Sequence, residues 1–141
     1  MMEKQRELEK EKEQVEKRLL NLARCALRMR PFVEKRNLSV DHEWRCRIAI
    51  GTGPVIGSIV GIHKYVYDVF GPPVNFSSRL EGPCEPMQIL GCPRTAERLE
   101  KDFVLRSLGS TEIRGFGVQE ILEVEAEIQR PRLAPGHRSS I

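Results

Sequence analysis

The chain has 141 residues, a formal net charge of +3, and 40% hydrophobic and 30% charged residues, which leaves room for one small globular domain. Acidic and basic residues are interleaved over the N-terminal third, so this part is a solvated mixed face and not the basic stripe of a nucleic-acid-binding protein. No apolar run reaches the length of a membrane span and no signal peptide is present, so the sequence predicts a cytoplasmic protein.

The first 36 residues are predicted to form a helix. Apolar residues recur there every three or four positions, the period of a coiled coil, at Val15, Leu19, Leu22, Ala26, Met29 and Val33. We expect this helix to pair with a copy of itself or with a partner helix, and the alternative is a frayed, solvated tail. Pro31 lies within the stripe and predicts a kink or a new start of the helix.

The middle of the chain changes to β-structure. Residues 45–50 alternate in polarity and residues 55–60 form an apolar run, so two strands are predicted to meet at the Gly-Pro turn of residues 51–54. Residues 65–70 can form a short extended piece. The apolar spacing of residues 74–81 predicts a helix, which the Gly-Pro pair that follows brings to an end.

The C-terminal part continues the mixture of strands and helices. A short strand is predicted at residues 87–90, followed by a helix that Thr95 caps and that extends to Leu105. Residues 108–125 predict two strands with a Gly-Phe-Gly turn between them. This order of elements predicts helices packed on a mixed sheet.

These patterns divide the chain into three parts. Residues 1–36 form the N-terminal helix or coiled coil, residues 37–127 form the folded domain, and residues 128–141, rich in Pro and Ser, are predicted to be a disordered tail.

The cysteines and histidines do not form a metal-binding pattern. There is no CxxC pair, and no histidine stands at ligand spacing from a cysteine, among Cys25, Cys46, Cys84, Cys92, His42, His63 and His137. We therefore predict reduced cysteines with structural roles.

Four ordered segments carry a resemblance to a known family. They are residues 47–61 (RIAIGTGPVIGSIVG), 67–71 (YDVFG), 74–81 (VNFSSRLE) and 113–117 (IRGFG). Together they resemble the second half of the class III nucleotidyl cyclase catalytic domain, the family that forms cyclic AMP or cyclic GMP. The resemblance implies an α+β, partial ferredoxin-like domain, with helices on a mixed, mainly antiparallel sheet, preceded by a signalling helix.

The first half of that domain is not recognisable in the sequence. Residues 23–37 already resemble the helix that, in the family, directly precedes the first of the four segments. The chain therefore resembles an internally truncated cyclase domain.

The resemblance also implies site residues. Asn75 and Arg79 are four residues apart on the predicted helix and match the pair that steadies the ribose and the transition-state phosphate in the family. From spacing alone, a helix cap and a surface ion pair would be the alternative. Asp68 matches the residue that reads the adenine amino group in adenylyl cyclases, and Arg114 matches the cation that holds the triphosphate.

The metal site is where the chain departs from the family. Two Asp residues normally hold Mg²⁺ or Mn²⁺, of which one would lie in the missing half and the other is replaced here by Arg45, which cannot ligate a cation. Asp41 could serve only if the following strand shifted its register. We therefore predict no metal ligands in this chain, as in the metal-free half of heterodimeric cyclases.

The resemblance thus implies an intracellular signalling lyase that converts ATP, or less readily GTP, to a cyclic nucleotide and pyrophosphate. Homodimers, or heterodimers with another cyclase half, are the expected assemblies, and the isolated chain is expected to show little or no turnover. The alternative is a non-catalytic, cyclase-like dimerisation or regulatory module. A third possibility is that the truncated sheet is too small to fold.

Overall fold

The computed structural model describes residues 1–131. In chain order, its elements are α1 (Met2–Asn37), β1 (Ile48–Ile50), β2 (Ile56–Val60), β3 (Val66–Phe70), α2 (Pro72–Leu80), β4 (Ile89–Gly91), α3 (Pro93–Leu99), β5 (Phe103–Ile113) and β6 (Gly117–Glu127). No helix among them is long and apolar enough to cross a lipid bilayer. Of the predicted tail, residues 132–141 lie outside the described residues.

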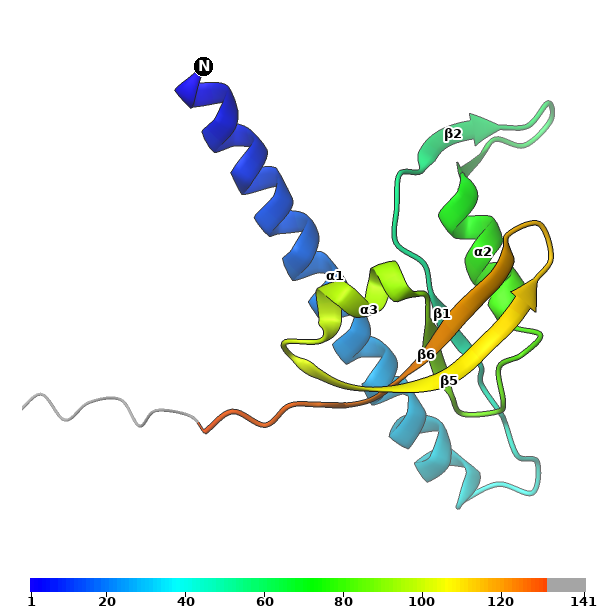
Figure 1. Cartoon of the computed structure of the whole chain (residues 1–141). Helices are drawn as coiled ribbons and strands as arrows, with labels where there is room; N and C mark the ends of the chain where they lie inside the picture. Colours follow the sequence, from blue (N-terminus) through cyan, green and yellow to red (C-terminus); the bar gives the residue numbers. More distant parts are fainter. Residues whose placement is uncertain (132–141) are drawn as a thin grey trace, which may run out of the picture.

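Four of the strands form one sheet in the order β1-β4-β6-β5. β1 and β4 are parallel, whereas β6 is antiparallel to both β4 and β5. β2 and β3 pair antiparallel in a separate two-stranded sheet, which Figure 1 shows at the upper right, away from the other strands. The α+β class and the mixed, mainly antiparallel sheet predicted from the sequence are confirmed.

The main sheet has helices on both faces. Neighbouring residues of a strand point to opposite sides, so a single strand can contact the helices of both faces. Ile89 of β4 belongs to a buried cluster with Leu19, Ala23 and Ala26 of α1. The next residue, Leu90, belongs to a second cluster with Phe76 and Leu80 of α2. The two clusters give this small domain a core on both faces of the sheet.

α1 is held on the sheet by its C-terminal half. Leu19 is its first buried residue, and every residue before it is exposed. Arg24 Nε donates to Glu127 Oε1 at 2.6 Å, and Arg30 Nη2 donates to the Glu125 carbonyl oxygen at 2.8 Å. The new helix start predicted at Pro31 is wrong, because α1 continues without interruption to Asn37.

The predicted pairing of residues 45–50 with residues 55–60 is also wrong. β1 pairs with β4 in the main sheet, whereas β2 pairs with β3, with Ile56 opposite Phe70. Residues 51–55 therefore connect a strand of the main sheet to a strand of the two-stranded sheet and do not form a hairpin turn. The extended piece at residues 65–70, which the sequence predicted only as an isolated segment, supplies the partner of β2.

The helix predicted to begin at Thr95 and to extend to Leu105 corresponds to α3, but both of its ends lie elsewhere in the structure. α3 begins earlier, with Cys92 as its N-cap, so Thr95 lies inside the helix and is buried. Its hydroxyl bonds to the Thr52 hydroxyl at 2.8 Å and donates to the Ile50 carbonyl oxygen at 3.3 Å. Leu105, predicted to be helical, lies in β5.

Candidate functional site

The helix α2 positions two of the predicted site residues. Its N-cap, Gly71, has φ = 145°, a conformation that favours glycine. Phe76 and Leu80 are four residues apart and bury one face of the helix. Asn75 and Arg79 each precede one of these residues, so they share the neighbouring face and are exposed to solvent.

Arg79 connects α2 to the turn that carries Arg114. Its Nη1 donates to the Arg114 carbonyl oxygen at 3.0 Å. The Phe76 and Phe116 rings pack edge to face, with centroids 5.0 Å apart and planes at 87°, which fastens the β5–β6 turn to α2. The structure therefore brings Arg79 and the backbone of Arg114 together, one helical turn from Asn75.

The surroundings of these residues suit an anion. Arg79 and Arg114 are both exposed, and neither forms a salt bridge with a carboxylate of residues 1–131. Arg79 also lines a hollow of about 520 Å³ with Arg47, Ser78, Glu81 and Gly82. A guanidinium with free N–H groups can bind phosphate oxygens. The alternative from spacing alone is not observed in the part of the chain that the structure describes, because Gly71 and not Asn75 is the helix cap and Arg79 forms no salt bridge there.

Asp68 lies on a different element from the other three predicted residues. It is exposed on β3, opposite Ser58 of β2, and its Oδ1 accepts the Val69 amide at 2.8 Å. No hydrogen bond joins it to Asn75, Arg79 or Arg114 within residues 1–131. Asp68 is thus carried by the two-stranded sheet, whereas Asn75 and Arg79 are carried by α2.

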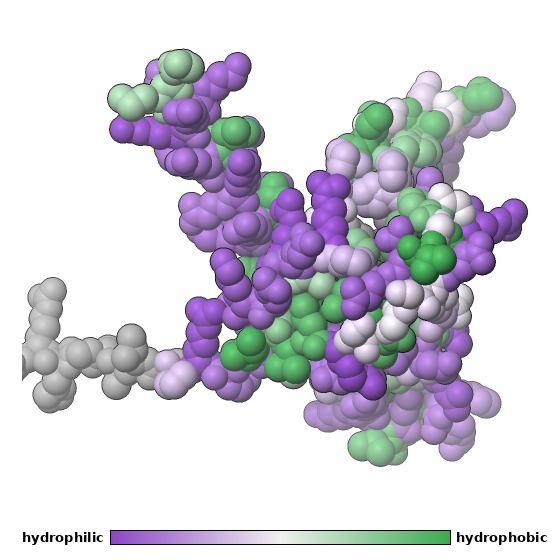
Figure 2. Space-filling view, in the orientation of Figure 1, coloured by the Kyte–Doolittle hydropathy of each residue, from purple (hydrophilic) through white to green (hydrophobic). Residues whose placement is uncertain are grey.

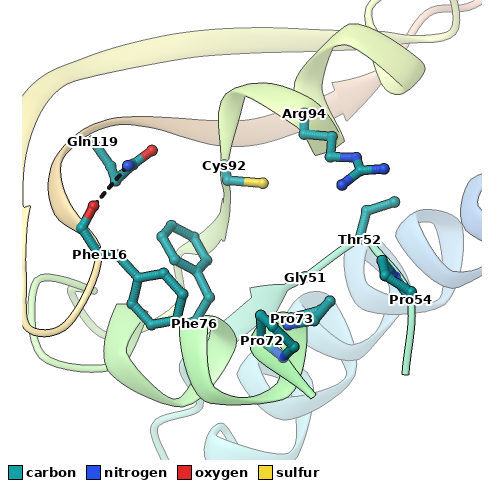
Figure 3. Close-up of a pocket in the computed structure, with 10 residues that line it drawn as sticks. All are labelled: Gly51, Thr52, Pro54, Pro72, Pro73, Phe76, Cys92, Arg94, Phe116 and Gln119. Carbon is teal, nitrogen blue, oxygen red and sulfur yellow. Dashed lines mark hydrogen bonds between the residues drawn. The ribbon is translucent and has the colours of Figure 1, made fainter. Parts of the chain in front are cut away.

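A cavity of about 300 Å³ beside this cluster has no counterpart in the sequence prediction. It is bounded by the segment after β1, the N-terminal ends of α2 and α3, the β5–β6 turn and the start of β6. The lining residues are Gly51, Thr52, Pro54, Pro72, Pro73, Phe76, Cys92, Arg94, Phe116 and Gln119. Figure 3 shows the Arg94 guanidinium extending toward Thr52. The Gln119 side-chain amide donates to the Phe116 carbonyl oxygen, with a distance of 2.9 Å between Nε2 and the oxygen. Five of the lining residues lie within the segments that resemble the family, but no local pattern predicts that these segments enclose one cavity: Gly51, Thr52, Pro54, Phe76 and Phe116.

The residues present do not fit the family's pair of metal ions. Arg45 is exposed, with its guanidinium 3.6 Å from the Glu43 carboxylate, and Asp41 lies in the loop before β1. No group of three or more His, Cys, Asp or Glu side chains within residues 1–131 could hold a metal ion. A guanidinium offers only donors and repels a cation, so Arg45 cannot take the place of a metal-binding carboxylate.

The four cysteines are free thiols in very different surroundings. Cys25 is exposed on α1, whereas Cys84 is buried beside α2, where burial raises the pKa of its thiol. Because the thiolate is the reactive form, we expect iodoacetamide at neutral pH to label Cys25 at least about 10-fold faster than Cys84. Mass spectrometry of the labelled peptides measures both rates, and the difference should vanish in urea. Equal labelling in the native chain would contradict the burial of Cys84.

Comparison with known proteins points to one family. The family model described as the adenylate and guanylate cyclase catalytic domain matches residues 6–125. An adenylate cyclase of Mycobacterium tuberculosis is 42% identical over 72 residues, which cover 51% of this chain and 16% of the relative. A receptor-type guanylate cyclase of Caenorhabditis elegans is 32% identical over 127 residues, which cover 83% of this chain and 12% of the relative. The chain therefore spans only a small part of the length of these relatives.

Solved structures show the same fold. The guanylate cyclase domain from Catenaria anguillulae, in complex with GTP, matches with a TM-score of 0.52 and 26% identity, over 54% of this chain and 42% of that one. An adenylyl cyclase from P. aeruginosa matches with a TM-score of 0.55 and 24% identity, over 72% and 52% of the two chains.

Proposed function

Because this chain belongs to the adenylate and guanylate cyclase catalytic domain family, we propose that it supplies one half of a nucleotide cyclase site and converts ATP to cyclic AMP and pyrophosphate with a complementary domain. The observation that carries this proposal is the cluster on α2. There, Asn75 and Arg79 share an exposed face, and Arg79 is bonded to the turn that holds Arg114.

The side chains of Asn75, Arg79 and Arg114 suit the charges that develop during cyclisation. The ribose 3′-oxygen bonds to the α-phosphorus and loses its proton, while the bond from that phosphorus to the pyrophosphate oxygen breaks. Negative charge increases on the phosphate oxygens as this happens. Arg79 and Arg114 supply positive charge for these oxygens, and the Asn75 amide supplies a hydrogen bond for the ribose.

The preference for ATP rests on Asp68. Its carboxylate can accept a hydrogen bond from the adenine amino group, whereas guanine presents a carbonyl at that position. The similarity to mycobacterial adenylate cyclases agrees with this choice, while the similarity to guanylate cyclases keeps GTP as the competing substrate. Asp68 lies on the β2–β3 sheet, so base recognition requires this sheet and α2 to face the same nucleotide.

The complementary domain is needed because the chain offers no fitting metal ligands. Arg45 occupies the position of a metal-binding Asp, so Mg²⁺ or Mn²⁺ would have to be held by carboxylates of another chain. A heterodimer with a metal-bearing cyclase half meets this requirement. A pair of identical chains does not supply those carboxylates.

The test is a cyclase assay with manganese and either ATP or GTP. The purified chain alone should give no measurable product, and a mixture with a separately expressed, metal-bearing cyclase half should form cyclic AMP from ATP. Product from the chain alone would contradict the role of a half site. No product in the mixture, from a chain shown to be folded and to bind its partner, would instead favour the non-catalytic regulatory module.

A further inference from the structure

The cavity of about 300 Å³ at the N-terminal ends of α2 and α3 takes no part in the proposed reaction. Asn75, Arg79 and Arg114 are not among its lining residues, and Arg79 lines a different hollow. A volume of this size is at the lower end of the range for small-molecule sites, so it suits a compound with one or two rings. The cavity is therefore a candidate site for a ligand other than the nucleotide.

The walls of the cavity are rigid and mainly apolar. The Phe76 and Phe116 rings pack edge to face, and three prolines line the cavity from the segment after β1 and the start of α2: Pro54, Pro72 and Pro73. Figure 3 shows the two phenyl rings on the side of the cavity opposite the Arg94 guanidinium. Proline side chains lose no rotamer freedom when a ligand binds. A ring-shaped ligand would thus bury its apolar surface against these walls at a small entropic cost.

Arg94 adds one positive charge to this apolar lining. Its side chain is exposed, and it forms no salt bridge with a carboxylate of residues 1–131. Its Nη1 lies 3.7 Å from the position that a Cβ would take at Gly53, so the absence of a side chain there leaves room for the guanidinium beside the loop. The guanidinium is therefore placed at the cavity with its charge not neutralised by an acidic neighbour.

Two other polar side chains of the lining already have partners. The Thr52 hydroxyl is bonded to the Thr95 hydroxyl at 2.8 Å, and the Gln119 amide donates to the Phe116 carbonyl oxygen. A single planar guanidinium matches a carboxylate, with which it forms two parallel hydrogen bonds. We propose that this cavity binds a small carboxylic acid with an aromatic or alicyclic body, whose carboxylate pairs with Arg94 and whose ring lies against the two phenyl rings.

This acid site is separate from the nucleotide cluster on α2 but shares one contact with it. The Phe76–Phe116 pair, which forms a wall of the cavity, also fastens the turn that carries Arg114 to α2. A bound acid would therefore touch the packing that positions Arg79 and Arg114. Binding of the acid itself does not depend on cyclisation, so it can be measured on the full chain without a complementary cyclase half.

A titration with phenylacetate, followed by NMR, tests the role of Arg94. Arg94→Gln should weaken the Kd roughly 5- to 10-fold, because one charge-assisted contact is lost. Arg94→Lys keeps the charge without the planar fork and should recover part of the affinity. Arg98→Gln is the matched control, because Arg98 is exposed on the same helix and does not line the cavity. An unchanged Kd in Arg94→Gln would overturn the proposal.

The neutral analogue phenylacetamide separates this site from apolar surface elsewhere on the chain. Figure 2 shows hydrophobic residues on the β2–β3 sheet at the upper right, where Ile56, Ile59 and Tyr67 are exposed. Such a surface would take up the acid and the amide alike, because the hydrophobic effect depends on apolar area and not on charge. Phenylacetamide should bind the cavity more weakly than phenylacetate, and equal affinities would overturn the proposal.

Alkylation of Cys92 shows whether the acid lies in the cavity. Cys92 lines it and is half-buried, whereas Cys25 is exposed on α1 and Cys84 is buried. With phenylacetate at ten times its Kd, about one site in eleven is free, so iodoacetamide should label Cys92 roughly 10-fold more slowly. The labelling rate of Cys25 should not change, and slow labelling of Cys84 shows that the chain stays folded. A Cys92 that is equally labelled with and without the acid, or that is closed to iodoacetamide in the free chain, would overturn the proposal.

Competition with inorganic pyrophosphate distinguishes the acid site from the nucleotide cluster. Pyrophosphate suits the guanidinium groups of Arg79 and Arg114, which lie outside the cavity. At constant ionic strength it should leave the protection of Cys92 by phenylacetate unchanged. Loss of that protection would assign the acid to the cluster on α2 and overturn the proposal, whereas a failed cyclase assay would leave the acid site intact.

Discussion

Replacing Arg79 by alanine is expected to lower the turnover of the complemented cyclase roughly 10²- to 10³-fold, the usual effect of removing one positioned donor that stabilises developing charge. Arg79 is exposed, and its one hydrogen bond to residues 1–131 is that to the Arg114 carbonyl oxygen, so its remaining N–H groups are available to phosphate oxygens. Arg79→Lys keeps the positive charge but loses the planar fork, so it should recover only part of the rate. The measurement is steady-state cyclic AMP formation, with kcat and KM resolved.

Arg98→Ala is the matched control for this variant. Arg79 and Arg98 each lie in the last turn of a short helix and are exposed, so both substitutions remove the same favourable interaction with the helix dipole. Arg98 belongs to α3 and lies outside the α2 cluster. An Arg79→Ala rate equal to that of the unchanged chain would remove Arg79 from the site, and an equal loss in Arg98→Ala would assign the effect to helix stability.

The short segments that resemble the family predicted the local placement of Asn75 and Arg79 well. A spacing of four residues places two side chains on one face of any helix, so the sequence alone fixed their relation to each other. It could not show that Arg79 reaches Arg114, 35 residues further on. That contact depends on the packing of Phe76 against Phe116, a tertiary event without a local pattern.

The strand pairings were harder to predict for a related reason. A Gly-Pro turn between two apolar runs is compatible with a hairpin or with a crossover to another sheet. The crossover occurs because β1 pairs in parallel with β4 and not with β2. β4 is a central strand, with Ile89 and Leu90 buried on its opposite faces. Periodicity likewise marked α1 as helical but could not show which part of its stripe the domain covers.

The helix predicted to extend to Leu105 shows how burial overrides a local pattern. Phe103 begins β5 and is 2% exposed, in the cluster that includes Leu19, Ala23 and Ala26 of α1. A helical continuation of α3 would not place this ring under α1. The position that the sequence misassigned is thus one that holds the long helix on the sheet.

Phe103→Ala should therefore destabilise the chain by about 3–5 kcal/mol, the range for deleting a buried aromatic ring and leaving a cavity. That is a large share of the roughly 5–15 kcal/mol that keeps a typical domain folded. Val104→Ala is the matched control, because Val104 is the next residue of β5, is 44% exposed and points to the other face. Val104→Ala should lower the free energy of unfolding by less than about 1 kcal/mol.

Urea unfolding followed by two probes shows whether Phe103 acts through α1. Far-UV circular dichroism reports the helix as a whole. Trp44, the only tryptophan, reports the C-terminal end of α1, because its ring lies 3.6 Å from the Arg36 guanidinium carbon and its backbone bonds to the Asn37 side chain. If the cluster around Phe103 couples α1 to the sheet, the unfolding midpoints reported by both probes should move to lower urea concentration by the same amount in Phe103→Ala. A shift in circular dichroism with an unchanged Trp44 transition would show that the end of α1 is held independently of this cluster.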